Sequence, residues 1–211
     1  MGFIKIVLLF LSIIILMSIA WRFLSDRVSI PCPSWLYWLV ELDNPFAKVC
    51  HAQSIVDFLH LLPEMNVLDV GCGSGRVTIA LAEKLDNRGL VTAMDIQQGM
   101  LDSVKQKAKA KKLNNIRLLH AGIGEGVLEH NYYDRAILST VLGEIPKQHR
   151  REALKEIYDA LKSDGILSIS EMIFDPHFQS KNTVLALAKE VGFREKKYFG
   201  RWFAYTVHLE K

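Results

Sequence analysis

The first residues that could do chemistry are the glycines of a turn that follows an apolar stretch. Residues 67–70 are Val-Leu-Asp-Val, and Gly71, Gly73 and Gly75 follow at alternate positions. Glycine has no Cβ, so such a turn lets the main chain bend sharply and approach a ligand closely. A strand that runs into a glycine turn and a helix offers backbone N–H groups at the sheet edge where doubly wound folds bind ligands. Several kinds of nucleotide site share this pattern.

An acidic residue stands at the end of the next apolar stretch. Asp95 lies about 20 residues beyond Gly75, which is the spacing at which an acid can accept hydrogen bonds from ribose hydroxyls. Its alternative role is to cap the helix that begins near Gln97. The two roles are compatible, because a carboxylate has several acceptor positions.

The segments around these residues alternate between strand-like and helix-like patterns. Such alternation predicts a parallel sheet covered on both faces by helices. The last two strands flank Gly200-Arg201 without a helix between them, which predicts an antiparallel hairpin. The expected fold class is α/β, with a doubly wound, mainly parallel seven-stranded sheet, a C-terminal antiparallel hairpin and an N-terminal apolar helix. Strands are expected at 67–70, 90–95, 116–120, 133–138, 165–170, 194–198 and 204–209, and helices at 45–62, 76–84, 100–112, 148–161 and 183–191.

The N-terminus departs from this globular pattern. No residue from Ile6 to Trp21 is charged. A helix over this run rises about 24 Å, somewhat short of a hydrocarbon core of about 30 Å. A retained membrane anchor, a cleaved signal peptide ending near Ala20 and a buried core helix are the three interpretations, and we favour the anchor. It occupies residues 1–24.

An aromatic and proline-rich connector is expected over residues 25–44. Trp35, Tyr37 and Trp38 follow closely on the apolar run, and such side chains are typical of a membrane interface. The alternative is that they pack on the globular domain.

Charge and cysteine content exclude some classes. The formal net charge of +3 is too small to indicate nucleic acid, and the lysines of residues 105–112 are better explained as a solvated helix face. Cys32, Cys50 and Cys72 are widely spaced, and they form neither a metal-ligand pattern nor a disulfide framework. We therefore expect no metal site and no nucleic-acid partner.

Taken in order, the motifs resemble those of the class I S-adenosylmethionine-dependent methyltransferases. The ordered set is far more specific than any one motif, and the resemblance extends over residues 45–211, the expected methyltransferase domain. The matching segments are residues 69–75 (Asp-Val-Gly-Cys-Gly-Ser-Gly), 93–96, 115–122, 133–138 and 161–167.

The resemblance implies S-adenosylmethionine as the cofactor. In the family the glycine turn, which here includes Cys72, cradles the methionine half of the cofactor, and the acid after the second strand, here Asp95, holds the ribose. This cofactor has an ammonium and a carboxylate but no pyrophosphate, so a turn preceded by an acid suits it. Asp69 is expected to hold the ammonium end, directly or through water.

The adenine end departs from the family pattern. The family often has an acid after the third strand, and Gly122 stands there in this chain. We expect backbone groups around Gly122 and Ile123 to bind the adenine instead, with Ile96 packing on the ring.

Groups beside the transferable methyl are expected after the fourth and fifth strands. In the family the segment after the fourth strand lies next to the methyl, which makes Glu144 the first catalytic candidate and Thr140 a lining residue. His177 follows the fifth strand and is a candidate base near neutral pH. The alternatives are a helix-capping glutamate, an ordinary strand-end threonine and a surface histidine. His51 is a weaker candidate.

These observations predict a membrane-anchored methyltransferase with a cytoplasmic catalytic domain. The expected acceptor is amphiphilic or lipid-like, such as a phospholipid head group or a quinone precursor. One alternative is a methyltransferase of a soluble small molecule that the anchor only localises. Another is a non-catalytic cofactor-binding scaffold. A nicotinamide-dependent dehydrogenase is disfavoured by the glycine spacing and by the terminal hairpin.

Overall fold

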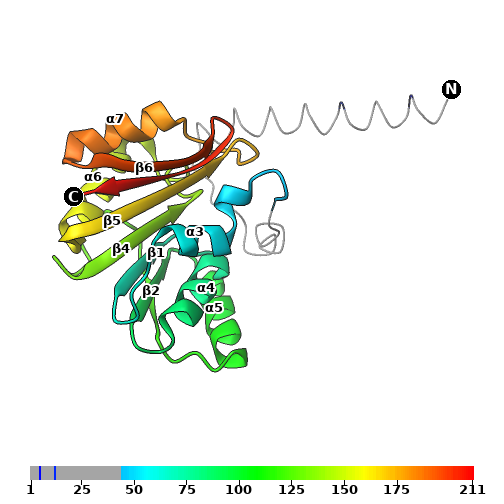
Figure 1. The fold of residues 1–211 in the computed structure, drawn as a ribbon, viewed down its shortest axis with the longest axis vertical. Helices are drawn as coiled ribbons and strands as arrows, with labels where there is room; N and C mark the ends of the chain where they lie inside the picture. Colours follow the sequence, from blue (N-terminus) through cyan, green and yellow to red (C-terminus); the bar gives the residue numbers. More distant parts are fainter. Residues whose placement is uncertain (1–4, 6–11, 13–43) are drawn as a thin grey trace.

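The computed structural model describes residues 5, 12 and 44–211. Residues 44–211 form an α/β domain in which strands and helices alternate, except that no helix lies between the third and fourth strands or between the last two (Figure 1). The strands are β1 Asn66–Val70, β2 Leu90–Asp95, β3 Ile116–His120, β4 Tyr133–Ser139, β5 Leu161–Met172, β6 Arg194–Arg201 and β7 Ala204–Glu210. The helices are α3 Ala52–Phe58, α4 Arg76–Leu85, α5 Gln98–Ala110, α6 Arg150–Ala160 and α7 Lys181–Val191, with 3-10 turns η2 Lys48–Cys50 and η3 Lys147–His149.

The strands form one seven-stranded sheet in the order β3-β2-β1-β4-β5-β7-β6. The first five strands in the chain pair in parallel, whereas β7 pairs antiparallel with both β5 and β6. The predicted mainly parallel sheet with a C-terminal antiparallel hairpin is therefore confirmed. The strand order reverses between β1 and β4, and the crevice at such a reversal is where open α/β sheets bind ligands.

Helices cover both faces of the sheet. The helices α3, α4 and α5 lie on one side of it, and α6 and α7 lie on the other (Figure 1). A strand that is covered on both faces is usually a nearly continuous apolar run rather than an alternating one. In β1, Val67, Leu68 and Val70 are all buried, and Asp69 is the one buried charged residue among them. The central strands are thus held on both sides, which fixes the positions of their carboxyl ends.

The first predicted helix is shorter than expected. The sequence predicted one helix over residues 45–62, but the chain forms the turn Lys48–Cys50 and then the short helix Ala52–Phe58. Between them His51 is extended (ψ 145°), and its ring nitrogen Nε2 lies 2.8 Å from the carbonyl oxygen of Asn44. This contact to an earlier loop breaks the helical pattern, which apolar spacing alone does not reveal.

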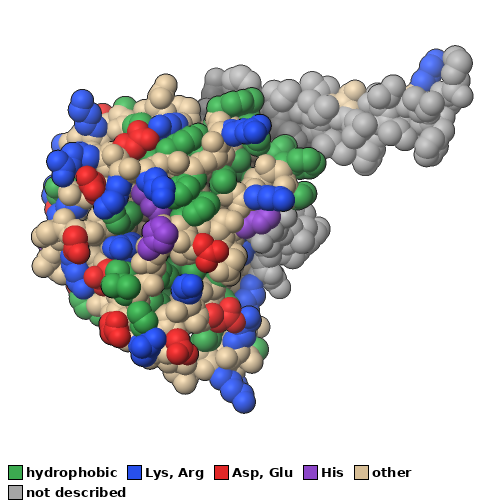
Figure 2. Space-filling model, viewed as in Figure 1, with side chains coloured by type: hydrophobic (Ala, Val, Ile, Leu, Met, Phe, Trp, Pro, Cys, Tyr) green, Lys and Arg blue, Asp and Glu red, His purple; other side chains and the backbone are tan. Residues whose placement is uncertain are grey.

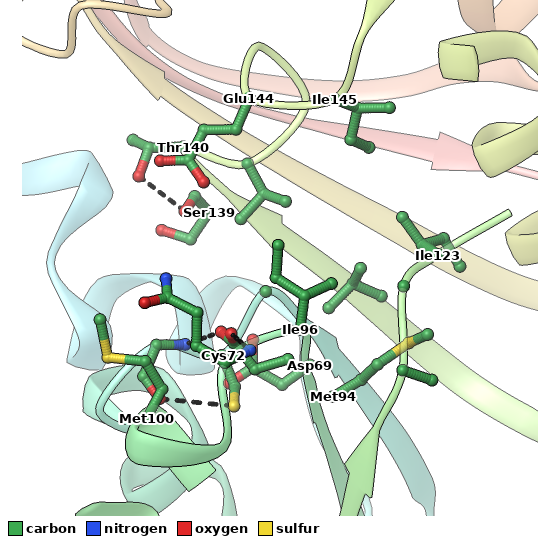
Figure 3. Close-up of a pocket in the computed structure, with 18 of the residues that line it drawn as sticks. Asp69, Cys72, Met94, Ile96, Met100, Ile123, Ser139, Thr140, Glu144 and Ile145 are labelled. Carbon is green, nitrogen blue, oxygen red and sulfur yellow. Dashed lines mark hydrogen bonds between the residues drawn. The ribbon is translucent and has the colours of Figure 1, made fainter. Parts of the chain in front are cut away.

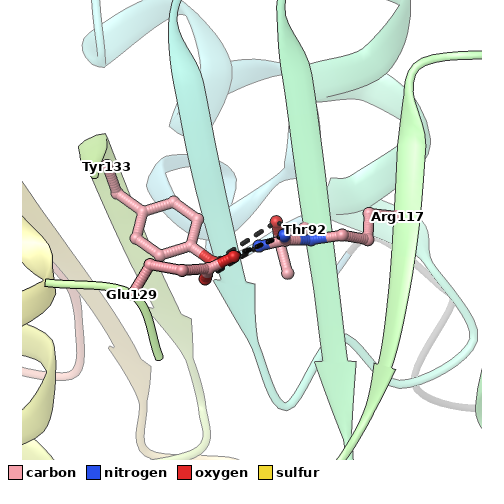
Figure 4. A network of polar contacts seen from close by, with 4 residues as sticks. All are labelled: Thr92, Arg117, Glu129 and Tyr133. Carbon is pink, nitrogen blue, oxygen red and sulfur yellow. Dashed lines mark hydrogen bonds and ion pairs between the residues drawn. The ribbon is translucent and has the colours of Figure 1, made fainter. Parts of the chain in front are cut away.

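A polar cluster on the sheet face ties the segment after β3 to the strands. The Arg117 guanidinium on β3 donates to Glu129 Oε1 (2.6 Å), to the Tyr133 hydroxyl (2.8 Å) and to Thr92 Oγ1 (3.2 Å) (Figure 4). These partners come from β2, from β4 and from the connection between β3 and β4. The cluster therefore anchors the far end of the connection whose first residues face the cavity described below.

The predicted anchor and most of the connector lie outside the described residues. Residues 1–24 are described only at Lys5 and Ser12, and the connector only at Asn44. Within the part of the chain that is described, no helix has the length and apolar character needed to cross a bilayer. The domain boundaries at residues 24 and 44 stay predictions.

Candidate active site

A cavity of about 650 Å³ opens at the carboxyl ends of β1, β2 and β4. Its walls come from the turns that follow β1, β2, β3 and β4, so segments far apart in the sequence face one another across it (Figure 3). The volume lies within the usual range for a small-molecule or cofactor site. We call the part between β1, β2 and β3 the cofactor end and the part after β4 the acceptor end.

The three glycines of the turn after β1 share an unusual backbone conformation but differ in their surroundings. Gly71, Gly73 and Gly75 all have positive φ values of 63°, 53° and 93°, which residues with a side chain rarely adopt. A Cβ on Gly71 would lie 2.6 Å from a methyl of Val141, and one on Gly75 would lie 2.9 Å from a methyl of Val104. A Cβ on Gly73 would meet no protein atom within 4 Å. Gly71 and Gly75 therefore permit close packing within the protein, and Gly73 leaves open space beside the turn.

Asp95 fastens the glycine turn to the end of β2. Its Oδ2 accepts the N–H of Gly73 at 2.9 Å, and its Oδ1 accepts the N–H of Gln97 at 2.8 Å. Gln97 is the N-cap residue that immediately precedes α5, so the carboxylate orders the helix start as well as lining the cavity. Each oxygen has a second lone pair, which can accept from a ligand hydroxyl. Burial raises the pKa of Asp95 above its ordinary value.

Asp69 is a buried carboxylate at the base of the cavity. Only 2% of its surface is exposed, and its Oδ2 accepts the Thr78 hydroxyl at 2.6 Å. Burial raises the pKa of Asp69 to about 6, while the Thr78 hydroxyl and the Arg76 charge act in the opposite direction. At neutral pH Asp69 is therefore a buried carboxylate whose negative charge is only partly balanced by its neighbours. A cationic ligand group beside it would supply the missing balance.

The segment after β3 supplies an acid that was not among the predicted site residues. Ile96, Gly122 and Ile123 line the cavity as predicted, and Ile96 is 55% exposed there. A Cβ on Gly122 would lie 2.5 Å from Glu125 Oε1, so that carboxylate lies directly over Gly122. Glu125 also lines the cavity. The only sequence signal was that Glu125 is the first acid after β3.

At the acceptor end the backbone is strained. Thr140 lines the cavity and has a φ of 58°, which is rare for a β-branched residue. Its N–H donates to the carbonyl oxygen of Ser170 (2.8 Å), and its hydroxyl donates to that of Ser139 (2.7 Å). Residues in such conformations cluster at functional sites, where the surrounding structure enforces them.

Glu144 lines the cavity together with side chains that were not predicted to be part of the site. Ile145, His149 and Glu152 line the same region, and Arg76 at the start of α4 lines it from the other side. Both His149 and Glu152 fall within the helix predicted over residues 148–161, and the sequence did not single them out as site residues. Their place in the cavity depends on how α6 is set against β4.

His177 lies behind the acceptor end and does not line the cavity. It is 7% exposed, and its N–H donates to Asp175 Oδ1 at 2.7 Å. A Cβ on Gly143 would lie 1.8 Å from the His177 carbonyl oxygen, so the loop after β5 packs directly on the segment after β4. A catalytic role for His177 stays a prediction, and its observed place is that of a supporting residue.

A buried arginine connects these two loops. Arg150, 5% exposed, donates to the carbonyl oxygens of Gly143 (2.8 Å) and Ile145 (2.8 Å) and to Gln179 Oε1 (2.9 Å). Gln179 in turn donates its N–H to Glu171 Oε2 at 3.0 Å, and burial raises the pKa of Glu171 well above its ordinary value. We call Arg150, Gln179 and Glu171 the buried polar chain. It holds the carbonyl groups on both sides of Glu144.

Comparison with known proteins identifies the kind of domain. Residues 67–165 match the family model described as "Methyltransferase domain". A demethylmenaquinone methyltransferase from Listeria welshimeri is 33% identical over 103 residues, which cover 49% of this chain and 43% of that protein. A protein of the same name from Staphylococcus epidermidis is 34% identical over 114 residues, covering 51% and 46%. The chain thus spans less than half the length of these relatives.

Solved structures show the same fold. A methyltransferase from Aquifex aeolicus described as SAM dependent superposes with a TM-score of 0.73 at 19% identity, over 84% of this chain and 98% of that one. The 1,6-didemethyltoxoflavin-N1-methyltransferase of Burkholderia thailandensis, solved with S-adenosylhomocysteine, gives a TM-score of 0.63 at 19% identity over 79% of each chain. Magnesium protoporphyrin IX methyltransferase from Synechocystis, solved with SAM, gives 0.63 at 22% identity, over 78% and 81%.

These matches confirm the predicted class. The described domain has the fold of the class I S-adenosylmethionine-dependent methyltransferases, and its residues 67–165 match the model of the methyltransferase domain. The predicted cofactor agrees with the SAM and S-adenosylhomocysteine bound in the two neighbours.

Proposed function

We propose that this chain transfers a methyl group from S-adenosylmethionine to an amphiphilic acceptor at a membrane. A quinone precursor or a phospholipid head group is the class of acceptor that we favour. The observation that carries the proposal is one cavity in which Asp69, the glycine turn and Asp95 stand opposite Thr140 and Glu144. The demethylmenaquinone methyltransferases among the relatives support the quinone class.

The residues at the cofactor end suit the proposed cofactor. Asp69 is an undercompensated anion for the ammonium group, and the Asp95 oxygens have lone pairs for the ribose hydroxyls. Gly73 leaves space for the methionine half beside the turn. Ile96 offers an exposed apolar side chain to the adenine ring, and Glu125 offers an acceptor for its amino group.

S-adenosylmethionine supplies a sulfonium methyl that is already activated toward displacement. The chain then has to align the acceptor and exclude water, and alignment alone contributes effective molarities of about 10⁵–10⁸ M. Val141, Ile145 and Pro146 are apolar lining side chains at the acceptor end. They favour the apolar part of an amphiphilic acceptor and keep water away.

An acceptor that loses a proton during transfer requires a base within reach. Glu144 and His149 are groups at the acceptor end that can take a proton. We propose Glu144 as the residue that contacts the proton-losing or cationic group, and Thr140 as the residue that shapes the methyl pocket.

The membrane part of the proposal rests on the N-terminal sequence. The charge-free run from Ile6 to Trp21 precedes the domain, and we propose that it anchors the chain with the catalytic domain in the cytoplasm. The rival is an enzyme for a soluble acceptor that the same segment only localises.

Radiolabelled methyl transfer from S-adenosylmethionine separates these possibilities. The full chain in detergent would be incubated with an organic extract of membranes and, in parallel, with a soluble small-molecule extract. Label in a lipid-phase product is the expected result. Label only in the soluble product would favour the rival, and label in neither, from a protein that binds the cofactor, would favour a non-catalytic scaffold.

A further inference from the structure

Three aromatic side chains are highly exposed to solvent on the domain surface. Phe46, Trp202 and Phe174 are 75%, 74% and 62% exposed, which makes them the most exposed large hydrophobic side chains of the described residues. Single exposed hydrophobic residues are common, but several in one place indicate a contact site.

The three side chains belong to one surface, although they come from three segments. Beneath them a small apolar cluster buries Ala47, Cys50 and Ala204, with Met172 and Phe203 packed against it. Phe46 and Trp202 adjoin members of this cluster in the chain. Phe174 follows Ile173, whose N–H donates to the Phe203 carbonyl oxygen at 2.7 Å. We call Phe46, Phe174 and Trp202 the aromatic rim.

The aromatic rim lies at the same edge of the sheet as the cavity. Because β5 runs parallel to β4 and β1, its end at Met172 lies at the carboxyl edge, where the cavity opens. Ala204, the first residue of β7, pairs with Met172 there. Figure 2 shows hydrophobic side chains gathered at this end of the molecule, around the turn between β6 and β7, with lysine and arginine side chains among them.

The charges beside the aromatic rim are basic. Lys48 and Arg201 are exposed next to it. The acid nearest to Phe174 in the chain, Asp175, is turned back into the protein, where its Oδ1 accepts the His177 N–H. Tryptophan and phenylalanine flanked by basic residues match the interfacial region of a bilayer that contains anionic lipids.

We propose that the aromatic rim inserts into the interface of an anionic lipid bilayer and holds the cavity mouth beside it. The lipid is preferred to a protein partner because the connector predicted at the membrane interface, residues 25–44, ends in the chain two residues before Phe46. This inference rests on the proposed function, which needs an amphiphilic acceptor to reach the cavity, and it adds a second lipid contact within the catalytic domain.

Fluorescence of Trp202 in the full chain tests the contact directly. Replacing the other three tryptophans (Trp21→Phe, Trp35→Phe and Trp38→Phe) leaves Trp202 as the only one. On addition of vesicles of brominated phosphatidylcholine with phosphatidylglycerol, we expect a blue shift and loss of most of the emission. Phe46→Ser with Phe174→Ser should remove most of that quenching, and vesicles without the anionic lipid should quench less.

Leu62 offers a matched control position. It is 60% exposed and precedes β1, so it lies at the amino edge of the sheet, opposite the aromatic rim. A chain with Leu62→Trp and without the other four tryptophans should keep its emission in the same vesicles. Equal quenching at both positions would overturn the proposal, as would Trp202 emission that is already blue-shifted without lipid, which would indicate coverage by this chain or a second copy.

Calorimetric titration of the same variants with S-adenosylmethionine tests the proposed methyltransferase function separately from the proposed lipid contact. Normal cofactor binding with unquenched Trp202 would refute the lipid contact alone. Absence of cofactor binding in the folded wild-type chain would refute the proposed function, whatever the fluorescence.

Discussion

The two ends of the cavity are held in place by different means. At the cofactor end, Asp95 fixes the glycine turn through the Gly73 N–H, and Thr78 bonds to Asp69 within one strand–turn–helix unit. At the acceptor end, Arg150 and Gln179 link the loop after β4, which precedes α6 in the chain, to the loop after β5, which follows α6. The first end is therefore held by contacts within and between successive strand–turn–helix units, and the second by a buried side chain that joins two separate loops. The contrast predicts that the two ends respond separately to mutation.

Breaking the buried polar chain should have the largest effect. Arg150→Met removes three hydrogen bonds and leaves the carbonyl groups of Gly143 and Ile145 unpaired. The free energy of unfolding should fall by about 3 kcal/mol, because each unsatisfied buried group costs about 1–3 kcal/mol. Chemical denaturation measures this, with Arg151→Met on the exposed side of α6 as the control.

The same Arg150→Met protein should bind S-adenosylmethionine within about twofold of the wild type, as each lost bond lies at the other end of the cavity. Loss of cofactor affinity in a protein that is still folded would show that the two ends are coupled.

Removing the Asp95 carboxylate should abolish most cofactor affinity. Asp95→Ala loses the proposed ribose contacts and also frees the N–H groups of Gly73 and Gln97. Hydrogen bonds to a charged group contribute about 1.5–3 kcal/mol each, so the affinity should fall by about 100-fold. Calorimetry measures the loss, and Asp102→Ala on the exposed side of α5 should bind normally. Unchanged binding by Asp95→Ala would place the ribose elsewhere.

Cofactor affinity should depend on pH through Asp69. Burial raises its pKa to about 6, so the carboxylate that attracts the ammonium group is neutralised as the pH falls through 6. Affinity should then fall by up to about tenfold per pH unit. A pH series of titrations measures this, and Asp69→Asn should bind weakly with little dependence on pH. Affinity that rises on acidification would contradict the assignment.

The stability of the ligand-free protein should change in the opposite direction. The folded pKa of Asp69 lies above its ordinary value of 3.8, so the folded state binds the proton more tightly than the unfolded state. The contribution of Asp69 to stability is complete below pH 3.8 and is lost as the pH rises through 6. The difference in unfolding free energy between wild type and Asp69→Asn across this range isolates the contribution.

Glu125 should have the smallest effect. Its side chain is exposed, and it contributes one proposed hydrogen bond to the adenine amino group. Glu125→Ala should weaken S-adenosylmethionine binding by about fivefold, which corresponds to about 1 kcal/mol. Glu190→Ala on the exposed side of α7 is the matched control. An unchanged dissociation constant would leave adenine recognition to backbone groups around Gly122, as the sequence alone suggested.

The sequence by itself determined the sheet, its hairpin and the cofactor end. The strand, turn and helix over residues 67–85 and the acid at Asp95 are local patterns, and the parallel topology follows from the alternation of elements. Each of these features depends on neighbours in the chain, so periodicity and spacing are enough to predict it. The helix expected over residues 45–62 failed because His51 contacts Asn44 outside the helical pattern.

Only the tertiary structure decided how the acceptor end is built. In the sequence Arg150 looks like an ordinary solvent-exposed charge on a helix, yet it is buried. His177 was expected beside the transferable methyl, yet it packs behind the segment that follows β4. The place of Glu125 over Gly122 and the gathering of the aromatic rim were likewise not visible in the sequence. The physical reason is that these positions depend on how α6 and the loops after β4, β5 and β6 pack together, and side-chain burial there is set by distant partners.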